Sequence, residues 1–382
     1  MKLISRVLLI SLSALFMSAC SWWGGEEEIQ PAELVSFDQE KKVKILWSAS
    51  VGSGLSEKYT KLTPAVNGDA IFASDVEGKV SAFNRLDGKR LWSVNLDTPL
   101  IGGVGSGPDQ VAVTSEQGEV IMLSSVDGTE LWRQQLSSET LSPVQMNADI
   151  AVAQLQSGKL VALDMASGER LWTYDSQIPR LTLRGTSAPI VAANLTIAGF
   201  ANGKLVAVLN NSGAEAWSRQ VVTPEGKSEL ERLIDIDARP LYKDGVIYIV
   251  SYQGKLVAVS ARDAQILWAQ NASSHQSLAV GFGNVYVSEE NGFIQAFDQG
   301  NSASIWRQTA LEYRQTTAPV AIGNSVAVGD FAGYLHFMSQ IDGHFVARYK
   351  VDSAGLRGDM IVVDDILYVL GNSGRLAALQ LD

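Results

Sequence analysis

The chain has 382 residues, of which 46% are hydrophobic and 19% charged, and its formal net charge is −11. A chain this acidic is a poor candidate for binding nucleic acid, whose phosphates need a basic surface. It has one cysteine, so no disulfide can form within the chain and the hydrophobic residues must supply the core.

The first 20 residues have the pattern of a bacterial lipoprotein signal. Lys2 and Arg6 precede an apolar run from Val7 to Met17, which is too short to span a bilayer. The run ends in Met17-Ser18-Ala19-Cys20, and small residues before a lone cysteine resemble the lipobox at which signal peptidase II cleaves. The alternative is an incidental or buried cysteine. We expect cleavage after residue 19 and acylation of Cys20.

The next residues are polar and glycine-rich. They include Gly24-Gly25 and the acidic run 26–28, which indicates a solvated tether or, equally, a plain disordered stretch. Ser21 directly after the cysteine resembles lipoproteins that are sorted to the outer membrane. We therefore divide the chain into a signal peptide (1–19), a lipidated tether (20–41) and one folded domain (42–382).

The folded domain contains eight repeats, each marked by a glycine. Successive glycines are 38 to 51 residues apart, the spacing of four-stranded propeller blades. The glycines are Gly78, Gly118, Gly158, Gly203, Gly254, Gly292, Gly333 and Gly374. Fourteen residues after each of the first six stands a tryptophan, namely Trp92, Trp132, Trp172, Trp217, Trp268 and Trp306. The seventh position is Ala347, and the eighth lies beyond the end of the chain.

The missing eighth tryptophan lies at the other end of the domain. After Gly374 only eight residues remain, enough for one strand, while 43–49 is a strand-like segment that carries Trp47. A last repeat completed by the first segment is typical of a closed ring. We predict an all-β fold, an eight-bladed β-propeller closed by an N-terminal strand. The fixed position of the tryptophans favours a structural dock between blades over a cofactor or sugar site.

The repeat is irregular at three connections. The interval from tryptophan to next glycine is 24 to 27 residues in five repeats, but 31 after Trp47, 31 after Trp172 and 37 after Trp217. Pro64, Pro189 and Pro240 all precede their glycine by fourteen residues, so the extra residues lie in the loops between blades. Two of these loops, about 174–188 and 218–239, are consecutive and must emerge side by side on one face. Functional residues are expected there.

Both loops carry apolar residues among charges. Leu181 and Leu183 lie between Arg180 and Arg184, as anchors inside a charged rim would. The alternative is that these leucines fold back onto the blade edge. For Leu233 and Ile234 in the second loop, the two interpretations are about equally favoured.

Residues with catalytic or metal-binding chemistry are few. The three histidines, His275, His336 and His344, lack metal-ligand spacing. The segment 102–107 is glycine-rich but matches no nucleotide-binding motif. Asp235-Ile236-Asp237 could form part of a cation site, but two carboxylates are a weak signal. We predict no enzyme activity, no cofactor and no metal.

The segment 162–172, Ala-Leu-Asp-Met-Ala-Ser-Gly-Glu-Arg-Leu-Trp, resembles the repeat of quinoprotein-type propellers. The lipobox, the eight repeats and the loop motifs Leu-Thr-Leu-Arg-Gly and Asp-Ile-Asp together resemble the propeller lipoproteins of the bacterial outer membrane β-barrel assembly (Bam) complex. This resemblance covers the whole mature chain.

The resemblance implies a non-enzymatic scaffold, anchored by lipid on the periplasmic side of the outer membrane of a Gram-negative bacterium. Its partner would be the periplasmic POTRA domains of the barrel protein BamA, and direct contact with unfolded barrel precursors stays open. The motif positions that would bind BamA are Leu181, Leu183, Arg184, Asp235 and Asp237. A quinone-dependent dehydrogenase and a propeller that binds ligands in its central funnel are the alternatives.

Overall fold

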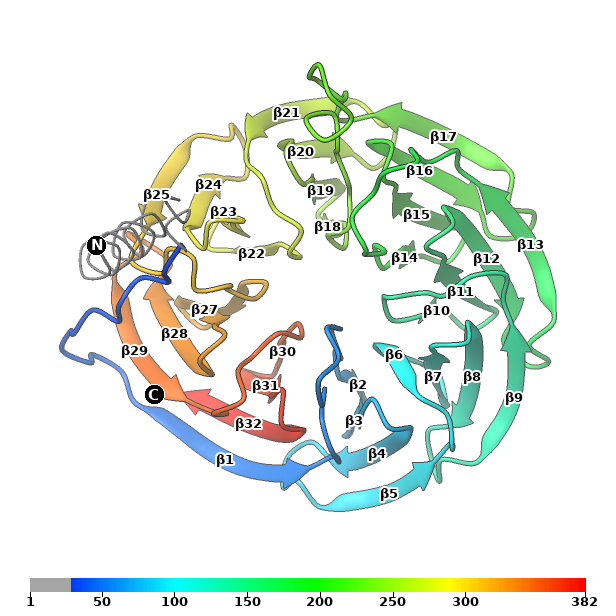
Figure 1. The fold of residues 1–382 in the computed structure, drawn as a ribbon, viewed down its shortest axis with the longest axis horizontal. Helices are drawn as coiled ribbons and strands as arrows, with labels where there is room; N and C mark the ends of the chain where they lie inside the picture. Colours follow the sequence, from blue (N-terminus) through cyan, green and yellow to red (C-terminus); the bar gives the residue numbers. More distant parts are fainter. Residues whose placement is uncertain (1–28) are drawn as a thin grey trace, which may run out of the picture.

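The computed structural model describes residues 29–382, whose regular structure consists of 32 β-strands. The strands form eight four-stranded antiparallel sheets, arranged as blades around a closed ring (Figure 1). The predicted all-β, eight-bladed propeller is therefore confirmed. In this part of the chain no helix is long and apolar enough to cross a membrane.

In the first seven blades the chain runs from the innermost strand outward. Blade 1 contains β2 (Ala65–Asn67), β3 (Ala70–Ser74), β4 (Lys79–Asn84) and β5 (Arg90–Asn95). Blade 2 contains β6 (Leu100–Gly107), β7 (Gln110–Ser115), β8 (Glu119–Ser124) and β9 (Glu130–Gln135). Blade 3 contains β10 (Gln145–Met146), β11 (Ile150–Gln154), β12 (Lys159–Asp164) and β13 (Arg170–Asp175). Blade 4 contains β14 (Ile190–Val191), β15 (Leu195–Gly199), β16 (Lys204–Leu209) and β17 (Glu215–Gln220).

The second half of the ring repeats this order. Blade 5 contains β18 (Leu241–Lys243), β19 (Val246–Val250), β20 (Lys255–Ser260) and β21 (Ile266–Asn271). Blade 6 contains β22 (Ala279–Gly281), β23 (Asn284–Ser288), β24 (Ile294–Asp298) and β25 (Ser304–Gln308). Blade 7 contains β26 (Val320–Ile322), β27 (Ser325–Gly329), β28 (Tyr334–Ser339) and β29 (Phe345–Lys350). Blade 8 contains β30 (Ile361–Val363), β31 (Ile366–Leu370), β32 (Arg375–Leu381) and, as its outer strand, β1 (Val43–Ser50).

The two ends of the domain close the ring in blade 8. Strand β1 pairs antiparallel with β32, and Trp47 lies opposite Ala378. Backbone hydrogen bonds run both ways between Lys42 and Asp382, at 3.1 and 2.9 Å. The predicted closure by the N-terminal strand is therefore confirmed, and it removes the exposed edge that an open blade would present.

Six of the seven tryptophans in residues 29–382 dock on a turn of the next blade. The indole N–H of Trp132 donates to the carbonyl of Met165 at 3.0 Å, and its ring packs against Gly168. Gly168 has a φ of +74°, and a Cβ there would lie 2.6 Å from the indole ring. At this turn glycine satisfies both conditions best, and the equivalent position is glycine in four other turns; Ala264 and Ser302 take it in blades 5 and 6, both at a positive φ. Five more tryptophans donate to the equivalent carbonyl, namely Trp47, Trp92, Trp172, Trp268 and Trp306.

The same dock explains the alanine at position 347. A tryptophan at position 347 would dock on the turn between the third and fourth strands of blade 8. Those strands are β32 and β1, which are the two ends of the domain, so no turn connects them. Ala347 is fully buried instead.

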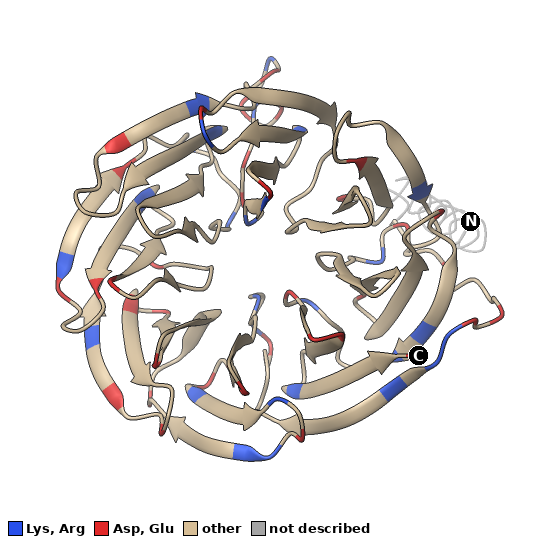
Figure 2. Ribbon diagram, turned by 180° about the vertical axis from the view of Figure 1, so that it is seen from behind, with Lys and Arg blue, Asp and Glu red and all other residues tan. Residues whose placement is uncertain are grey.

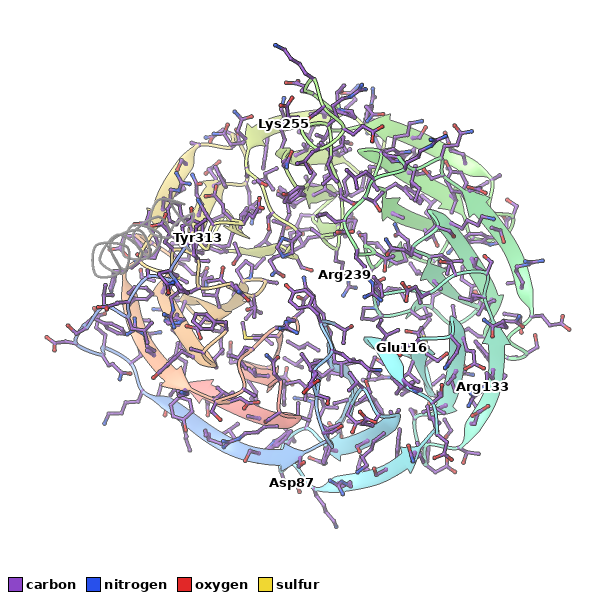
Figure 3. All side chains as sticks on the ribbon, in the orientation of Figure 1. Asp87, Glu116, Arg133, Arg239, Lys255 and Tyr313 are labelled. Atoms are coloured by element: carbon purple, nitrogen blue, oxygen red, sulfur yellow. The ribbon has the colours of Figure 1, made fainter. Side chains whose placement is uncertain are left out.

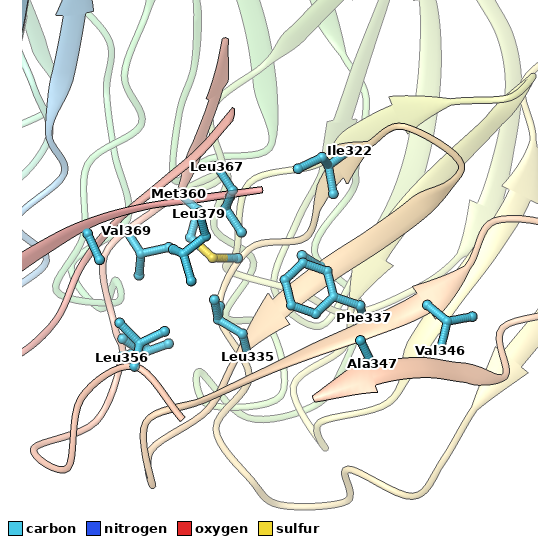
Figure 4. Close-up of a cluster of buried hydrophobic side chains, with 13 residues drawn as sticks. Ile322, Leu335, Phe337, Val346, Ala347, Leu356, Met360, Leu367, Val369 and Leu379 are labelled. Atoms are coloured by element: carbon cyan, nitrogen blue, oxygen red, sulfur yellow. The ribbon is translucent and has the colours of Figure 1, made fainter. Parts of the chain in front are cut away.

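The hydrophobic core is divided among the interfaces between blades. One cluster joins Leu335 and Phe337 of β28 to Val369 of β31 and Leu379 of β32, and so packs blade 7 against blade 8 (Figure 4). Equivalent clusters fill the other interfaces. Because every blade packs on two neighbours, the ring is a rigid frame for its loops.

Residues 30–41 of the predicted tether lie against blade 7. Arg314 donates to the carbonyl of Ala32 at 2.8 Å, and Arg348 donates to that of Val35 at 2.8 Å. Phe37 stacks on Phe345 with ring centres 5.4 Å apart. We call residues 30–41 the strap. Cys20 and the signal peptide lie outside the described residues.

Strand direction determines which loops share a face. Neighbouring strands of a blade are antiparallel, so the connections from a fourth strand to the next blade emerge on the same face as the turns between second and third strands. We call this face the connection face. Charged residues of both signs lie around the axis as well as on the outer strands (Figure 2).

Candidate functional site

Two long connections lie side by side on the connection face. Loop 176–189 joins β13 to β14, and loop 221–240 joins β17 to β18. Both therefore flank blade 4, as the sequence predicted, and they are held together by specific contacts. We call them the first and the second loop.

Asp235 of the second loop holds the backbone of the first loop. Its Oδ2 accepts a hydrogen bond from the backbone N–H of Leu183 at 3.1 Å, and only 3% of the residue is exposed. Its own backbone is fixed by Tyr252, whose N–H donates to the Asp235 carbonyl at 2.8 Å. Asp235 therefore acts inside the chain, as a support for the segment that carries Leu181 to Arg184.

Asp237 packs under the same segment. A Cβ on Gly185 would lie 2.4 Å from the Asp237 carboxylate, so glycine is required for the loops to approach this closely. Burial and the neighbouring Asp237 raise the pKa of Asp235 to about 8, while burial raises the pKa of Asp237 to about 6 against the opposing charge of Lys61. The pair therefore shares a proton near neutral pH.

The supported segment presents apolar and basic side chains to solvent. Leu181 is 42% exposed and Leu183 is half-buried. Arg184 is exposed, and its guanidinium lies 3.5 Å from the carboxylate of Glu139, a separation that marks a loose surface pair. Leucine beside a mobile guanidinium offers an apolar contact and a charge-assisted hydrogen bond to a partner.

The apolar residues of the second loop behave differently. Leu233 and Ile234 are 6% and 3% exposed, and Ile234 packs with Ile236 in the core between blades 4 and 5. Of the two interpretations left open by the sequence, the structure selects the one in which they fold back onto the blade. Leu230, which the sequence did not single out, is 67% exposed at the tip of this loop.

Two supporting residues come from the neighbouring blade. Gln156 donates from its side-chain amide to the carbonyl of Leu183 at 3.2 Å, and the backbone N–H of Gln156 donates to the carbonyl of Glu139 at 2.9 Å. Neither residue belongs to a motif or an irregular interval, so sequence reasoning had no signal for them. A cavity of about 20 Å³ remains between the loops, room for one water molecule.

The described residues contain no group of three or more His, Cys, Asp or Glu side chains placed to hold a metal ion. The histidines lie apart. His336 is buried and bonded to Asp330 at 3.0 Å, whereas His344 is at the surface beside Asp342. His275 lies near the axis, where burial lowers its pKa to about 4.

Comparison with known proteins places the chain among assembly factors. The family model described as outer membrane protein assembly factor BamB matches residues 30–98 and 76–308. The protein of that name from Pseudomonas aeruginosa is 52% identical over 365 residues, which cover 96% of each chain. The crystal structure of BamB from Moraxella catarrhalis superposes with a TM-score of 0.82 at 27% identity and covers 89% of this chain and all of that one. A europium-containing methanol dehydrogenase matches with a TM-score of 0.71 over 88% of this chain and 93% of its own, but its identity of 14% shows a shared fold alone.

Proposed function

The chain belongs to the family of outer membrane protein assembly factor BamB, and we propose that it acts there as a scaffold that binds the POTRA domains of BamA through the first loop. The proposed contacts are Leu181, Leu183 and Arg184, with Asp235 and Asp237 as their support. In this role the protein carries out no catalytic step. It positions BamA, a component of the Bam complex, for the insertion of barrel proteins.

One observation carries the proposal. Two of the three loops where the repeat is extended are consecutive and are also joined to each other, through the Asp235 carboxylate and the Leu183 backbone. A loop that is pre-ordered in this way loses little conformational entropy on binding. Leu181 and Arg184 remain exposed because the bonds that order the loop use its backbone rather than these side chains.

The binding mode follows from the exposed groups. The leucines would enter an apolar depression on the partner, and Arg184 would exchange Glu139 for a carboxylate of the partner. Because the Arg184–Glu139 pair is exposed and loose, breaking it costs little. The exchange therefore favours a partner whose surface combines apolar and acidic residues.

A double variant tests the interface. Leu183→Ala with Arg184→Ala should abolish co-purification with BamA while the propeller stays folded, as judged by its thermal unfolding temperature. A matched control is Leu131→Ala with Arg262→Ala, which changes one exposed leucine and one exposed arginine elsewhere on the ring. Wild-type co-purification by the loop variant would show that the assigned face is wrong.

The membrane anchor is a separate part of the proposal. Acylation of Cys20 would attach the protein to the periplasmic side of the outer membrane, because three acyl chains bind a bilayer far more firmly than one. Cys20→Ala should therefore move the protein from the membrane fraction to the soluble periplasmic fraction. The measurement is best made in cells depleted of BamA, where membrane retention of the variant would point to another anchor.

A further inference from the structure

The third enlarged connection, residues 51–64 between β1 and β2, runs toward the centre of the ring (Figure 1). Its ends are held by buried side chains, with Leu55 5% and Leu62 3% exposed. The backbone N–H of Leu55 donates to the carbonyl of Asn372 at 2.9 Å. Residues 56–61 lie between these two fixed points. We call residues 51–64 the third loop.

The third loop lies on the connection face, like the first and second loops. It joins the outer strand of blade 8 to the inner strand of blade 1, so it must emerge where the other connections emerge. Lys58 confirms the placement, since its Nζ lies 2.6 Å from Oε1 of Glu116. Glu116 is in the turn between β7 and β8, on the inner part of blade 2 (Figure 3).

A continuous line of contacts leads from this turn to Arg184. The backbone N–H of Leu136 donates to the carbonyl of Gly118 at 2.8 Å, which brings the turn after Glu116 against the connection to blade 3. A Cβ on Gly118 would lie 3.4 Å from the backbone N of Glu139, and Glu139 is the residue that pairs with Arg184. The third loop and the first loop are therefore parts of one surface.

A second set of contacts joins the third loop to residues on other sides of the axis. Lys61 extends from the third loop and donates to Oε1 of Gln276, at the entrance to blade 6, at 2.8 Å. Its positive charge also opposes the rise that burial causes in the pKa of Asp237, which packs beneath Gly185. Arg239, at the end of the second loop, reaches the centre of the ring (Figure 3). All three loops thus meet around the axis.

The tip of the third loop presents an ordered aromatic side chain. Tyr59 is 80% exposed, and the guanidinium of Arg357 lies 4.2 Å from its ring centre. Arg357 also donates to the carbonyl of Lys58 at 3.3 Å, which fixes the backbone beside the tyrosine. An exposed ring gains little for folding by burial, but tyrosine and arginine are among the residue types most enriched at the energetic centre of protein interfaces.

We propose that Tyr59 and Arg357 form a second anchor for the same partner that binds Leu183 and Arg184. The inference rests on the proposed function, because it extends that interface along the connection face. The segment of BamA that covers the anchor would place an apolar side chain on the exposed side of the Tyr59 ring and a carboxylate against Arg357. Two anchors on separate loops would fix the orientation of the partner as well as its position.

Binding of the full-length protein, purified in detergent, to immobilised POTRA domains of its own BamA tests the proposal. Tyr59→Ala should weaken binding by about tenfold or more, the effect expected for a central aromatic residue. Tyr59→Phe should bind like the wild type, because it keeps the ring. Phe282→Ala is the matched control, since Phe282 is 69% exposed in the turn between β22 and β23, on the opposite face.

Comparison with the double variant of Leu183 and Arg184 separates the two proposals. Loss of binding by both Tyr59→Ala and the double variant, with Phe282→Ala unaffected, supports the second anchor. Wild-type binding by Tyr59→Ala together with loss by the double variant overturns the second anchor and leaves the proposed function intact. Wild-type binding by both variants overturns both proposals.

Discussion

Replacement of Asp235 by alanine should weaken binding to BamA although the carboxylate does not face the partner. The side chain is buried, and its Oδ2 accepts the backbone N–H of Leu183 at 3.1 Å. Without this carboxylate, the backbone N–H of Leu183, which holds the first loop against the second, loses its acceptor. The loop that carries Leu181 and Arg184 then spends less time in the conformation that binds.

The size of the effect follows from the hydrogen bond. A buried N–H left without an acceptor costs about 1–3 kcal/mol, and Leu183 is half-buried, so water can reach it and the lower part of that range applies. A loss of about 1–2 kcal/mol reduces the ratio of ordered to open loop by roughly 5- to 30-fold. Affinity falls by the same factor at most, since only the ordered fraction binds.

Asp235→Asn is the informative control. The amide oxygen can still accept from Leu183, and the neutral amide, like the protonated carboxyl, places no second negative charge beside Asp237. We therefore expect Asp235→Asn to bind within a few-fold of the wild type at pH 7 while Asp235→Ala does not. Equal loss by both variants would show that the carboxylate contacts the partner directly, and wild-type binding by Asp235→Ala would refute the supporting role.

The same pair predicts a pH dependence. The pKa of Asp235 is raised to about 8 in the ordered loop, against about 4 in an open, solvated loop. The ordered loop therefore binds the proton more tightly, so its stability is full below about pH 4 and falls as the pH rises toward 8. Calorimetric titration with the POTRA domains should show weaker binding at pH 8.5 than at pH 6 for the wild type. Asp235→Asn, which cannot ionise there, should lose most of this difference.

Two further predictions concern the stability of the propeller and of the strap. Trp92→Ala should lower the free energy of unfolding, measured by urea titration, by about 3–5 kcal/mol, since the ring is buried and hydrogen-bonded to the Ser125 carbonyl. Trp217→Ala should cost less in the same titration, because its indole is only half-buried and finds no such acceptor among residues 29–382. Equal costs would contradict the dock as the source of stability. Phe37→Ala should release the strap, measured as faster tryptic cleavage after Lys41 than in the wild type, and an unchanged cleavage rate would show that stacking on Phe345 does not hold it.

The fold could be predicted because its determinants are periodic. Seven of the eight repeat-marking glycines adopt a positive φ. In five blades the turn glycine equivalent to Gly168 also makes room for an indole ring, so the sequence displays both glycines at a nearly fixed spacing. The alanine at 347 was visible as an exception, but its cause was not. It depends on the absence of a turn between β32 and β1, which is a property of the closed ring.

The site could be predicted only in part. The enlarged intervals located the long connections between blades, because insertions in a repeat must lie between its elements. The alternation in Asp235-Ile236-Asp237 suggests carboxylates that point away from the buried Ile236, yet Asp235 is buried too, since it satisfies a backbone N–H of another loop. Such a contact joins residues 52 positions apart and leaves no local pattern. The strap was missed for the same reason, because Arg314 and Arg348 hold it largely by backbone carbonyls.

The strap determines where a lipid anchor can lie relative to the interface. Ala32 is bonded to Glu312 and Arg314 in the connection between blades 6 and 7, so the chain enters the ring from the connection face. In a ring of eight, blade 7 lies across from blade 3, where the first loop begins (Figure 1). With the lipid proposed at Cys20, twelve residues separate it from Ala32, and their full extension is about 40 Å. Without the strap, 22 residues up to Lys42 would allow about 75 Å. With the anchor proposed at Cys20, docking of the strap would shorten the tether and would place the connection face, with all three loops, toward the membrane.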